Sequence, residues 1–238
     1  MLDQVVQWTQ NLDAIVESLL LCRVLTLKLH RVYTFITLFC TVNVLFDLAG
    51  WVLGWQSRAN ERLYIYSLFL LAVVIPFAAW DVFEEIKTRI AKLRRVHAAR
   101  LVSGIFMSSI FALILSAFLD AKDENGESSV RAVIAILIWA GSCSASLAFV
   151  RFIFKAVRTD KIELPNNTFV WAVFCMLTFV LSIVGCALAL LGFLFNKAVR
   201  DGVELGLIGI ELALTTWCMI RLRAVPSEAS SVADETRS

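Results

Sequence analysis

The stretch Phe169–Phe195, FVWAVFCMLTFVLSIVGCALALLGFLF, decides the fold, because its 27 residues contain no charged side chain. A helix needs about 20 mostly apolar residues to cross the hydrocarbon core of a bilayer. In lipid, every backbone N–H and C=O must find a partner within the protein, which a helix provides within its own segment. The stretch therefore predicts a transmembrane helix.

Comparable apolar segments lie on both sides of it, separated by short polar breaks. Hydrophobic residues make up 59% of the chain and the mean hydropathy is +0.78, whereas a soluble domain is roughly 45–50% apolar. We predict an all-α, polytopic membrane protein with seven transmembrane helices. Residues 1–223 form one helical bundle in this prediction, and 224–238 form a disordered polar tail. The other segments are Val5–Leu21, Val32–Trp55, Leu63–Trp80, Leu101–Leu119, Val130–Phe154 and Gly202–Leu222.

The first segment leaves two interpretations open. It carries Asp13 and Glu17, yet its apolar residues recur at helical spacing. This pattern fits a span packed against other helices, with Asp13 and Glu17 facing inward. It also fits an amphipathic helix that lies on the membrane surface, which would leave six spans. The apolar residues of this stripe are Val5, Trp8, Leu12, Ile15, Leu19 and Cys22.

Orientation follows from the distribution of Lys and Arg, which are enriched on the cytoplasmic side of membrane proteins. The breaks after the first, third and fifth segments, together with the C-terminal end, hold 16 of the 22 basic residues. The opposite side holds the other 6. We therefore expect the N-terminus outside and the C-terminus in the cytoplasm, with a bacterial inner (cytoplasmic) membrane as the location.

Several kinds of chemistry are excluded by the residues present. The two histidines, His30 and His97, lie at the predicted cytoplasmic edge, so neither a haem between helices nor a Ser–His pair at depth is expected. The seventh segment has no lysine for a retinal Schiff base. No C-x-x-C pair or phosphate-binding motif is present. We predict a protein that is not an enzyme, has no metal or cofactor, and, with a net charge of +2, has no nucleic-acid partner.

Polar side chains at membrane depth are the first candidate site. Glu211 lies about 13 Å along the seventh helix from Gly202, at about 1.5 Å per residue, which is near mid-bilayer. A buried carboxylate without a cation at matching depth is expected to hold a proton, bind a cation or water, or bond a neighbouring helix. The ligand or ion candidates are Glu211, Glu204, Asp47, Asn43, Asp13 and Glu17.

The stretch Asp81–Arg100 is the second candidate, because basic residues surround an apolar stripe there. It is expected either to dock anionic lipid headgroups or a partner protein, or only to fix topology. The basic residues are Lys87, Arg89, Lys92, Arg94, Arg95 and Arg100.

Three smaller features concern helix geometry. Pro76 is expected to kink the third helix, either as a hinge or as an adjustment of shape. The spacing of Gly202 and Gly206 predicts a helix-packing face. Asp201 with Glu204 predicts the start of the seventh helix.

The N-terminal half resembles uncharacterised bacterial seven-helix integral membrane proteins. The resembling residues are LLLCRVLTLKLHRVY, from Leu19 to Tyr33, and the stretch Glu84–Arg100 after the third segment. This resemblance implies the seven-helix fold and no activity, and no functional residue is carried over from it.

Two functional hypotheses follow. The first is a non-enzymatic sensor or receptor-like module, or a subunit of a membrane assembly, that signals to a membrane or cytoplasmic protein. The second is a small proton- or cation-coupled transporter or channel that uses the intramembrane carboxylates. The two differ in whether those carboxylates line one cavity or pack against separate helices.

Overall fold

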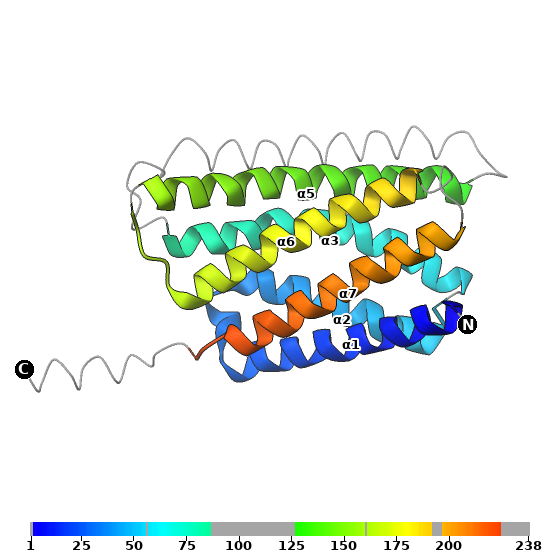
Figure 1. Ribbon diagram of the computed structural model, residues 1–238, viewed down its shortest axis with the longest axis horizontal. Helices are drawn as coiled ribbons and strands as arrows, with labels where there is room; N and C mark the ends of the chain where they lie inside the picture. Colours follow the sequence, from blue (N-terminus) through cyan, green and yellow to red (C-terminus); the bar gives the residue numbers. More distant parts are fainter. Residues whose placement is uncertain (1, 56, 87–126, 160, 192–196, 225–238) are drawn as a thin grey trace, which may run out of the picture.

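The computed structural model describes the chain except residues 1, 56, 87–126, 160, 192–196 and 225–238 (Figure 1). The described residues form helices and no strand. Both the fourth predicted segment, 101–119, and nearly all of the predicted tail, 224–238, lie outside the described residues. The helices are α1 (Leu2–Thr26), the 3-10 helix η1 (Leu29–Arg31), α2 (Thr34–Leu53), α3 (Arg58–Ile86), α5 (Glu127–Thr159), α6 (Asn166–Leu191) and α7 (Lys197–Arg221).

Five described helices, α2, α3, α5, α6 and α7, are long and apolar enough to cross a membrane. The prediction of a helical, multi-pass membrane protein is confirmed at this level. Each helix begins or ends within a few residues of the segment that predicted it. The seventh helix begins at Lys197, four residues before Asp201. The expectation that Asp201 and Glu204 mark its start is therefore wrong, since the helix continues through the polar residues before them.

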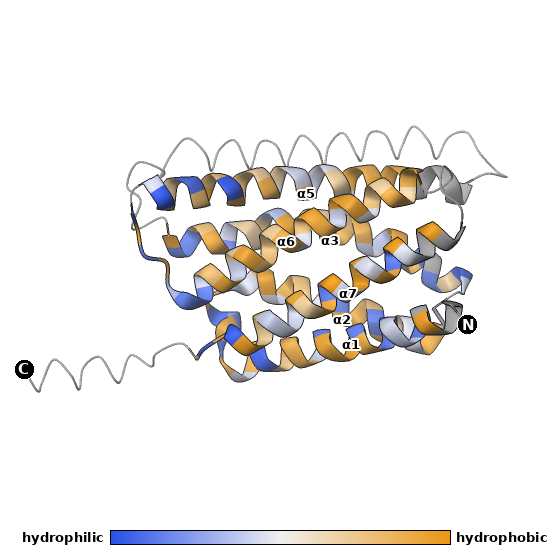
Figure 2. Ribbon diagram, viewed as in Figure 1, coloured by the Kyte–Doolittle hydropathy of each residue, from blue (hydrophilic) through white to orange (hydrophobic). Residues whose placement is uncertain are grey.

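The six long helices form a ring, because each packs against the next in the order α1, α2, α3, α5, α6, α7, and α7 packs against α1. We call one end of this ring the basic end: α1, α3, α5 and α7 finish there, and α2 and α6 begin there (left in Figure 1). We call the other end, where α1, α3, α5 and α7 begin, the mouth end. In Figure 2 the helices are mainly orange along their length, with blue residues gathered near several helix ends and scattered along α1, α2 and α7.

The basic end is closed by packed side chains. Trp171, Ile36, Val82 and Val24 are at most 1% exposed. Tyr33, also buried, has its hydroxyl 3.0 Å from that of Thr168 on α6. This end therefore joins α1, α2, α3, α5 and α6 in one apolar core, to which Cys218, near the end of α7, also belongs.

The start of α2 is capped by a neighbouring helix rather than by its own sequence. Tyr33 stands at the N-cap position and provides no side-chain hydrogen bond there. Instead, one carboxylate oxygen of Asp81 on α3 accepts hydrogen bonds from the backbone N–H groups of Phe35, at 2.6 Å, and Ile36, at 3.0 Å. A side-chain oxygen bonded to the second and third N–H groups is the usual role of an N-cap residue. Asp81 therefore fastens α3 to α2.

Pro76 lies inside α3, which continues through it to Ile86. A proline has no N–H to donate to the carbonyl four residues before it, which here belongs to Ala72. The hydroxyl of Ser142 on α5 donates to that carbonyl instead. The small residue at 142 thus replaces the lost helix bond and joins α3 to α5.

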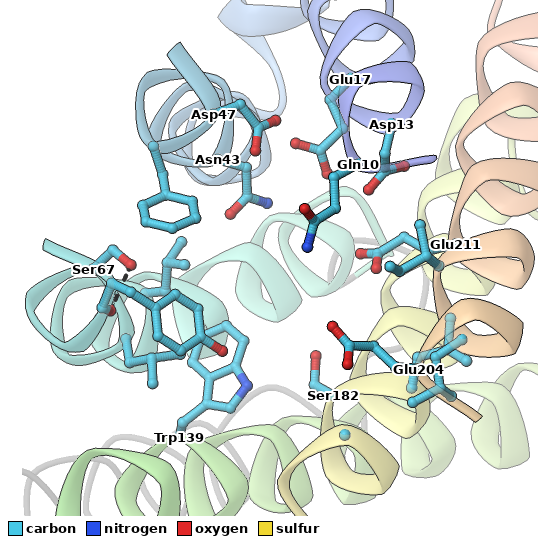
Figure 3. Close-up of a pocket in the computed structure, with 18 of the residues that line it drawn as sticks. Gln10, Asp13, Glu17, Asn43, Asp47, Ser67, Trp139, Ser182, Glu204 and Glu211 are labelled. Atoms are coloured by element: carbon cyan, nitrogen blue, oxygen red, sulfur yellow. Dashed lines mark hydrogen bonds between the residues drawn. The ribbon is translucent and has the colours of Figure 1, made fainter. Parts of the chain in front are cut away.

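The first helix faces outward with its apolar side. Trp8 is 76% exposed and Leu19 is 50% exposed, and the rest of the predicted stripe is also exposed. Gln10, Asp13 and Glu17 point into the ring instead (Figure 3). The expected inward direction of Asp13 and Glu17 is therefore observed. The helix packs against α2 and α7, but its apolar stripe is exposed, so residues outside the stripe make most of these contacts.

The predicted glycine face of α7 is also not packed. A Cβ built at Gly202, Gly206 or Gly209 meets no atom outside its own turn within 4 Å. The G-x-x-x-G spacing therefore does not mark a contact between the described helices.

Candidate functional site

A cavity of about 1110 Å³ occupies the ring at the mouth end. All six long helices contribute to its wall, together with the turn between α2 and α3. That turn depends on two glycines. Gly54 ends α2 with a φ of +83°, and a Cβ at Gly50 would lie 2.7 Å from the ring of Trp55. The indole N–H groups of Trp51 and Trp55 both donate to Asn11 Oδ1, which ties α1 to this turn.

The cavity opens at the mouth end and is closed toward the basic end. Exposed residues of its wall, including Gln7, Gly54 and Glu204, come from the first turns of α1, the α2–α3 turn and the first turns of α7. Buried residues such as Phe39, Leu71 and Thr178 lie deeper along their helices. Beyond them the core of the basic end begins, so the cavity is a one-sided vestibule.

All six residues predicted as ligand or ion candidates line this one cavity. They come from three helices that are adjacent in the ring, and their spacings of four or seven residues put each pair on one helix face. In Figure 3 their side chains converge from α1, α2 and α7. Glu204 is exposed near the mouth, whereas the other five are partly buried. The residues are Asp13 and Glu17 of α1, Asn43 and Asp47 of α2, and Glu204 and Glu211 of α7.

The wall is rich in carboxyl groups. Among the described residues that line the cavity, five are Asp or Glu, and none is Lys, Arg or His. Glu17 interacts directly with Asp47, and Asp13 and Glu211 are among the charged groups around it. Carboxylates gathered in this way repel one another when all are ionised. The cluster is therefore suited to holding protons or a positively charged ligand.

Seven buried side-chain atoms of the described residues have no hydrogen-bond partner, and three of them belong to residues that line the cavity. Asp13 Oδ1, Glu17 Oε2 and Asn60 Oδ1 are buried and have no partner within the described part of the chain. Asn60 itself is only 4% exposed. Buried polar groups are almost always satisfied in native proteins, so an unsatisfied group calls for an explanation.

The opposite wall is aromatic and apolar. Tyr64 and Leu68 of α3, Trp139 and Ile136 of α5, and Leu181 of α6 contribute to it. Figure 3 shows Trp139 across the cavity from Asp47, Glu17 and Asp13, with Ser182 between Trp139 and Glu204. The cavity thus has two chemically different faces.

Sequence reasoning missed the aromatic wall and Asn60. Trp139 and Tyr64 read as ordinary apolar residues of their segments, and only the packing of α3 and α5 into the ring brings them to the acidic helices. A partial signal existed for Gln10, which lies three residues before Asp13 on the same face of α1.

Two further predictions concern metals and the basic stretch. Where the structure describes the chain, no three His, Cys, Asp or Glu side chains could hold one metal ion. The lipid or partner-binding candidates Lys87, Arg89, Lys92, Arg94, Arg95 and Arg100 all lie outside the described residues.

Comparison with models of protein families, with curated proteins and with solved structures finds no match for this chain. Its function is therefore argued from the cavity alone.

Proposed function

We propose that this protein is a small membrane carrier that takes up protons or cations through the acid-lined cavity. The observation that carries the proposal is the convergence of five carboxyl groups from α1, α2 and α7 on one cavity, where no described wall residue is Lys, Arg or His. Ionisable residues inside a membrane bundle that face a water-accessible space are typical of ion and substrate pathways. A structural role would instead pair each carboxylate with a donor on a neighbouring helix.

The one-sided shape of the cavity favours a carrier over an open channel. Access from the basic end requires the packed side chains around Trp171 and the contact between Tyr33 and Thr168 to separate. In alternating access, a closed side of this kind opens after the first side has closed. The six long helices would then all belong to the membrane bundle, with α1 as an additional span.

The outward apolar face of α1 supports its placement in the membrane. The large apolar residues of its stripe, such as Trp8 and Leu19, are exposed, whereas Gln10, Asp13 and Glu17 line the cavity. A helix of a water-soluble protein has the reverse arrangement. A surface-lying amphipathic helix would instead direct its charged face to water rather than toward α2 and α7.

We propose that the mouth faces outside, with the N-terminus outside and the C-terminus in the cytoplasm, in a bacterial inner membrane. Among the described residues, nine Lys or Arg lie toward the basic end and five toward the mouth end, which is the asymmetry that the positive-inside rule uses. Arg58→Cys and Lys161→Cys, each in a Cys22→Ser background, test this with a maleimide that does not cross membranes. Labelling of intact cells is expected at position 58 alone. Labelling at position 161 alone would show that the chain has the opposite orientation.

A sensor or assembly subunit is the second candidate, because a cavity that opens at one end can also bind a ligand without moving it. A flux measurement separates the two functions. Protein in liposomes with an internal pH dye is exposed to a proton gradient and to a potassium diffusion potential. A carrier is expected to dissipate the proton gradient or the potassium potential. Binding of a cation without any flux of protons or potassium would favour the sensor.

Site variants make this measurement specific. Glu17→Gln and Glu211→Gln are expected to lower the flux at least tenfold, because each removes an ionisable group from the cavity without changing its size. Glu163→Gln, an exposed site beyond the basic end, is the matched control and is expected to keep the parental flux. Parental flux in both cavity variants would overturn the proposal.

A further inference from the structure

The cavity is much larger than a bare ion requires. Its volume is about 1110 Å³, whereas pockets for small organic molecules run from roughly 300 to 1,000 Å³. A protein usually binds a bare ion with a compact shell of ligands, and no such shell is found among the described residues. The size therefore fits a molecule.

The two faces of the cavity specify a molecule with two different parts. The carboxyl groups of Asp13, Glu17 and Asp47 attract positive charge, while Trp139 presents its aromatic ring on the other side (Figure 3). Tyr64 of α3 adds a second aromatic ring to the cavity wall. Aromatic faces bind cations and apolar groups, and a ligand cation within about 6 Å of a ring centre is attracted by the ring quadrupole. An organic cation with an apolar or aromatic body satisfies both faces.

The acidic face adds that the cation is a hydrogen-bond donor. The carboxyl groups that line this face belong to Asp13, Glu17 and Asp47. Carboxylate oxygens accept hydrogen bonds, and a bond from a charged N–H group to a carboxylate is stronger than one between neutral groups. A cation with N–H groups can form such bonds here, whereas a quaternary ammonium ion cannot.

We propose that the cavity binds a primary or secondary organic ammonium ion whose body is aromatic or apolar. The ammonium group lies at the acidic face and donates N–H bonds to it, and the body lies against Trp139 and Tyr64. This inference rests on the proposed function, since it names the class of cation that the cavity takes.

The test uses 2-phenylethylamine as the probe, with isothermal titration calorimetry on the full chain in mild detergent at pH 7. Two matched molecules separate the contributions. 2-Phenylethanol keeps the ring and loses the charge, so no binding is expected. Trimethyl(2-phenylethyl)ammonium keeps the ring and charge but has no N–H, so its binding is expected to be at least tenfold weaker. Equal binding of the alcohol would overturn the charge argument, and equal binding of the trimethyl compound would overturn the donor argument.

Variants then assign the binding to this cavity. Glu17→Gln and Tyr64→Leu are expected to weaken the binding of 2-phenylethylamine at least fivefold, through the acidic and aromatic faces respectively. Trp139→Leu is expected to weaken the binding to the same extent. If truncation of the buried Trp139 prevents folding, Tyr64→Leu still tests the aromatic face, because Tyr64 is 46% exposed. Trp8→Leu, on the outward face of α1, is the control and should bind like the parent. Parental binding in Glu17→Gln and Tyr64→Leu would overturn the assignment.

The outcome is separable from that of the proposed function. Proton or potassium flux without binding of the amine leaves the carrier in place and refutes the ammonium ligand. Binding of the amine without any flux of protons, potassium or the amine supports the ligand and refutes the carrier.

Discussion

The two halves of the bundle are built from the same helices but serve opposite requirements. At the basic end, polar groups such as Asp81, Ser142 and Tyr33 are buried among closely packed apolar side chains, and each has a partner on another helix. Buried atoms without a hydrogen-bond partner occur in both halves, such as Trp171 Nε1 toward the basic end and Glu17 Oε2 at the mouth end. The mouth end differs because polar groups of the same helices surround a cavity there. The difference indicates that the basic end supplies stability, whereas the mouth end gives up part of it to create a binding space. Substitutions in the two halves should therefore differ in size and even in sign.

The largest loss of stability is expected from Trp171→Ala in the core of the basic end. Trp171 is fully buried and its ring contacts Tyr33 and Phe174, so truncation leaves a large void. Such a change costs about 3–5 kcal/mol. Trp8→Ala removes the same atoms from an exposed site and should cost at most about 0.5 kcal/mol. Denaturant unfolding of both variants in one detergent measures the difference, and equal losses would show that the basic end is not the stable half.

Asp81→Ala is expected to lower the free energy of unfolding by about 2 kcal/mol, because two N–H groups at the start of α2 lose their acceptor. Asp81→Asn keeps one side-chain oxygen and should lose less than half as much. Hydrogen exchange at Phe35 and Ile36 should quicken in the alanine variant, since these are the freed donors. Unchanged exchange there would mean that the capping bond contributes nothing to stability.

Ser142→Ala is expected to cost about 1 kcal/mol, because the carbonyl of Ala72 loses its donor. Pro76→Ala supplies the missing N–H within α3. In the Pro76→Ala background, Ser142→Ala should therefore cost nearly nothing, and the double-mutant cycle should show clear coupling. Additive losses would contradict the idea that Ser142 replaces the helix bond lost at the proline.

The sequence predicts the helices well because lipid leaves the chain few alternatives. Apolar length alone locates α2, α3, α5, α6 and α7, and the observed helices extend a few residues past most segments. Backbone bonding continues through polar residues at the ends, which is why α7 begins at Lys197 and not at Asp201. The direction of α1 is harder to predict, since a stripe facing lipid and a stripe facing a core have the same spacing.

The site is predicted in part for a related reason. Carboxyl and amide side chains at membrane depth stand out in a sequence, and the six candidates chosen on that criterion all line the cavity. Capping of α2 by Asp81 and the bond from Ser142 to Ala72 depend on which helices are neighbours. That information is absent from a single sequence, and so is the arrangement of Trp139 and Tyr64 opposite the acids.

The smallest effect on stability is expected where the effect on function is expected to be largest. Glu17→Gln keeps the size of the side chain and removes an ionisable group from a cluster that includes Asp13, Asp47 and Glu211. Because relief of repulsion offsets any lost bond, the free energy of unfolding at pH 7 should change by at most about 0.5 kcal/mol or rise. Denaturant unfolding in the detergent used for Trp171→Ala measures it, alongside the flux in liposomes. A stability loss above about 2 kcal/mol would instead make Glu17 a structural group like Asp81, and the contrast between the two halves would fail at its most acidic point.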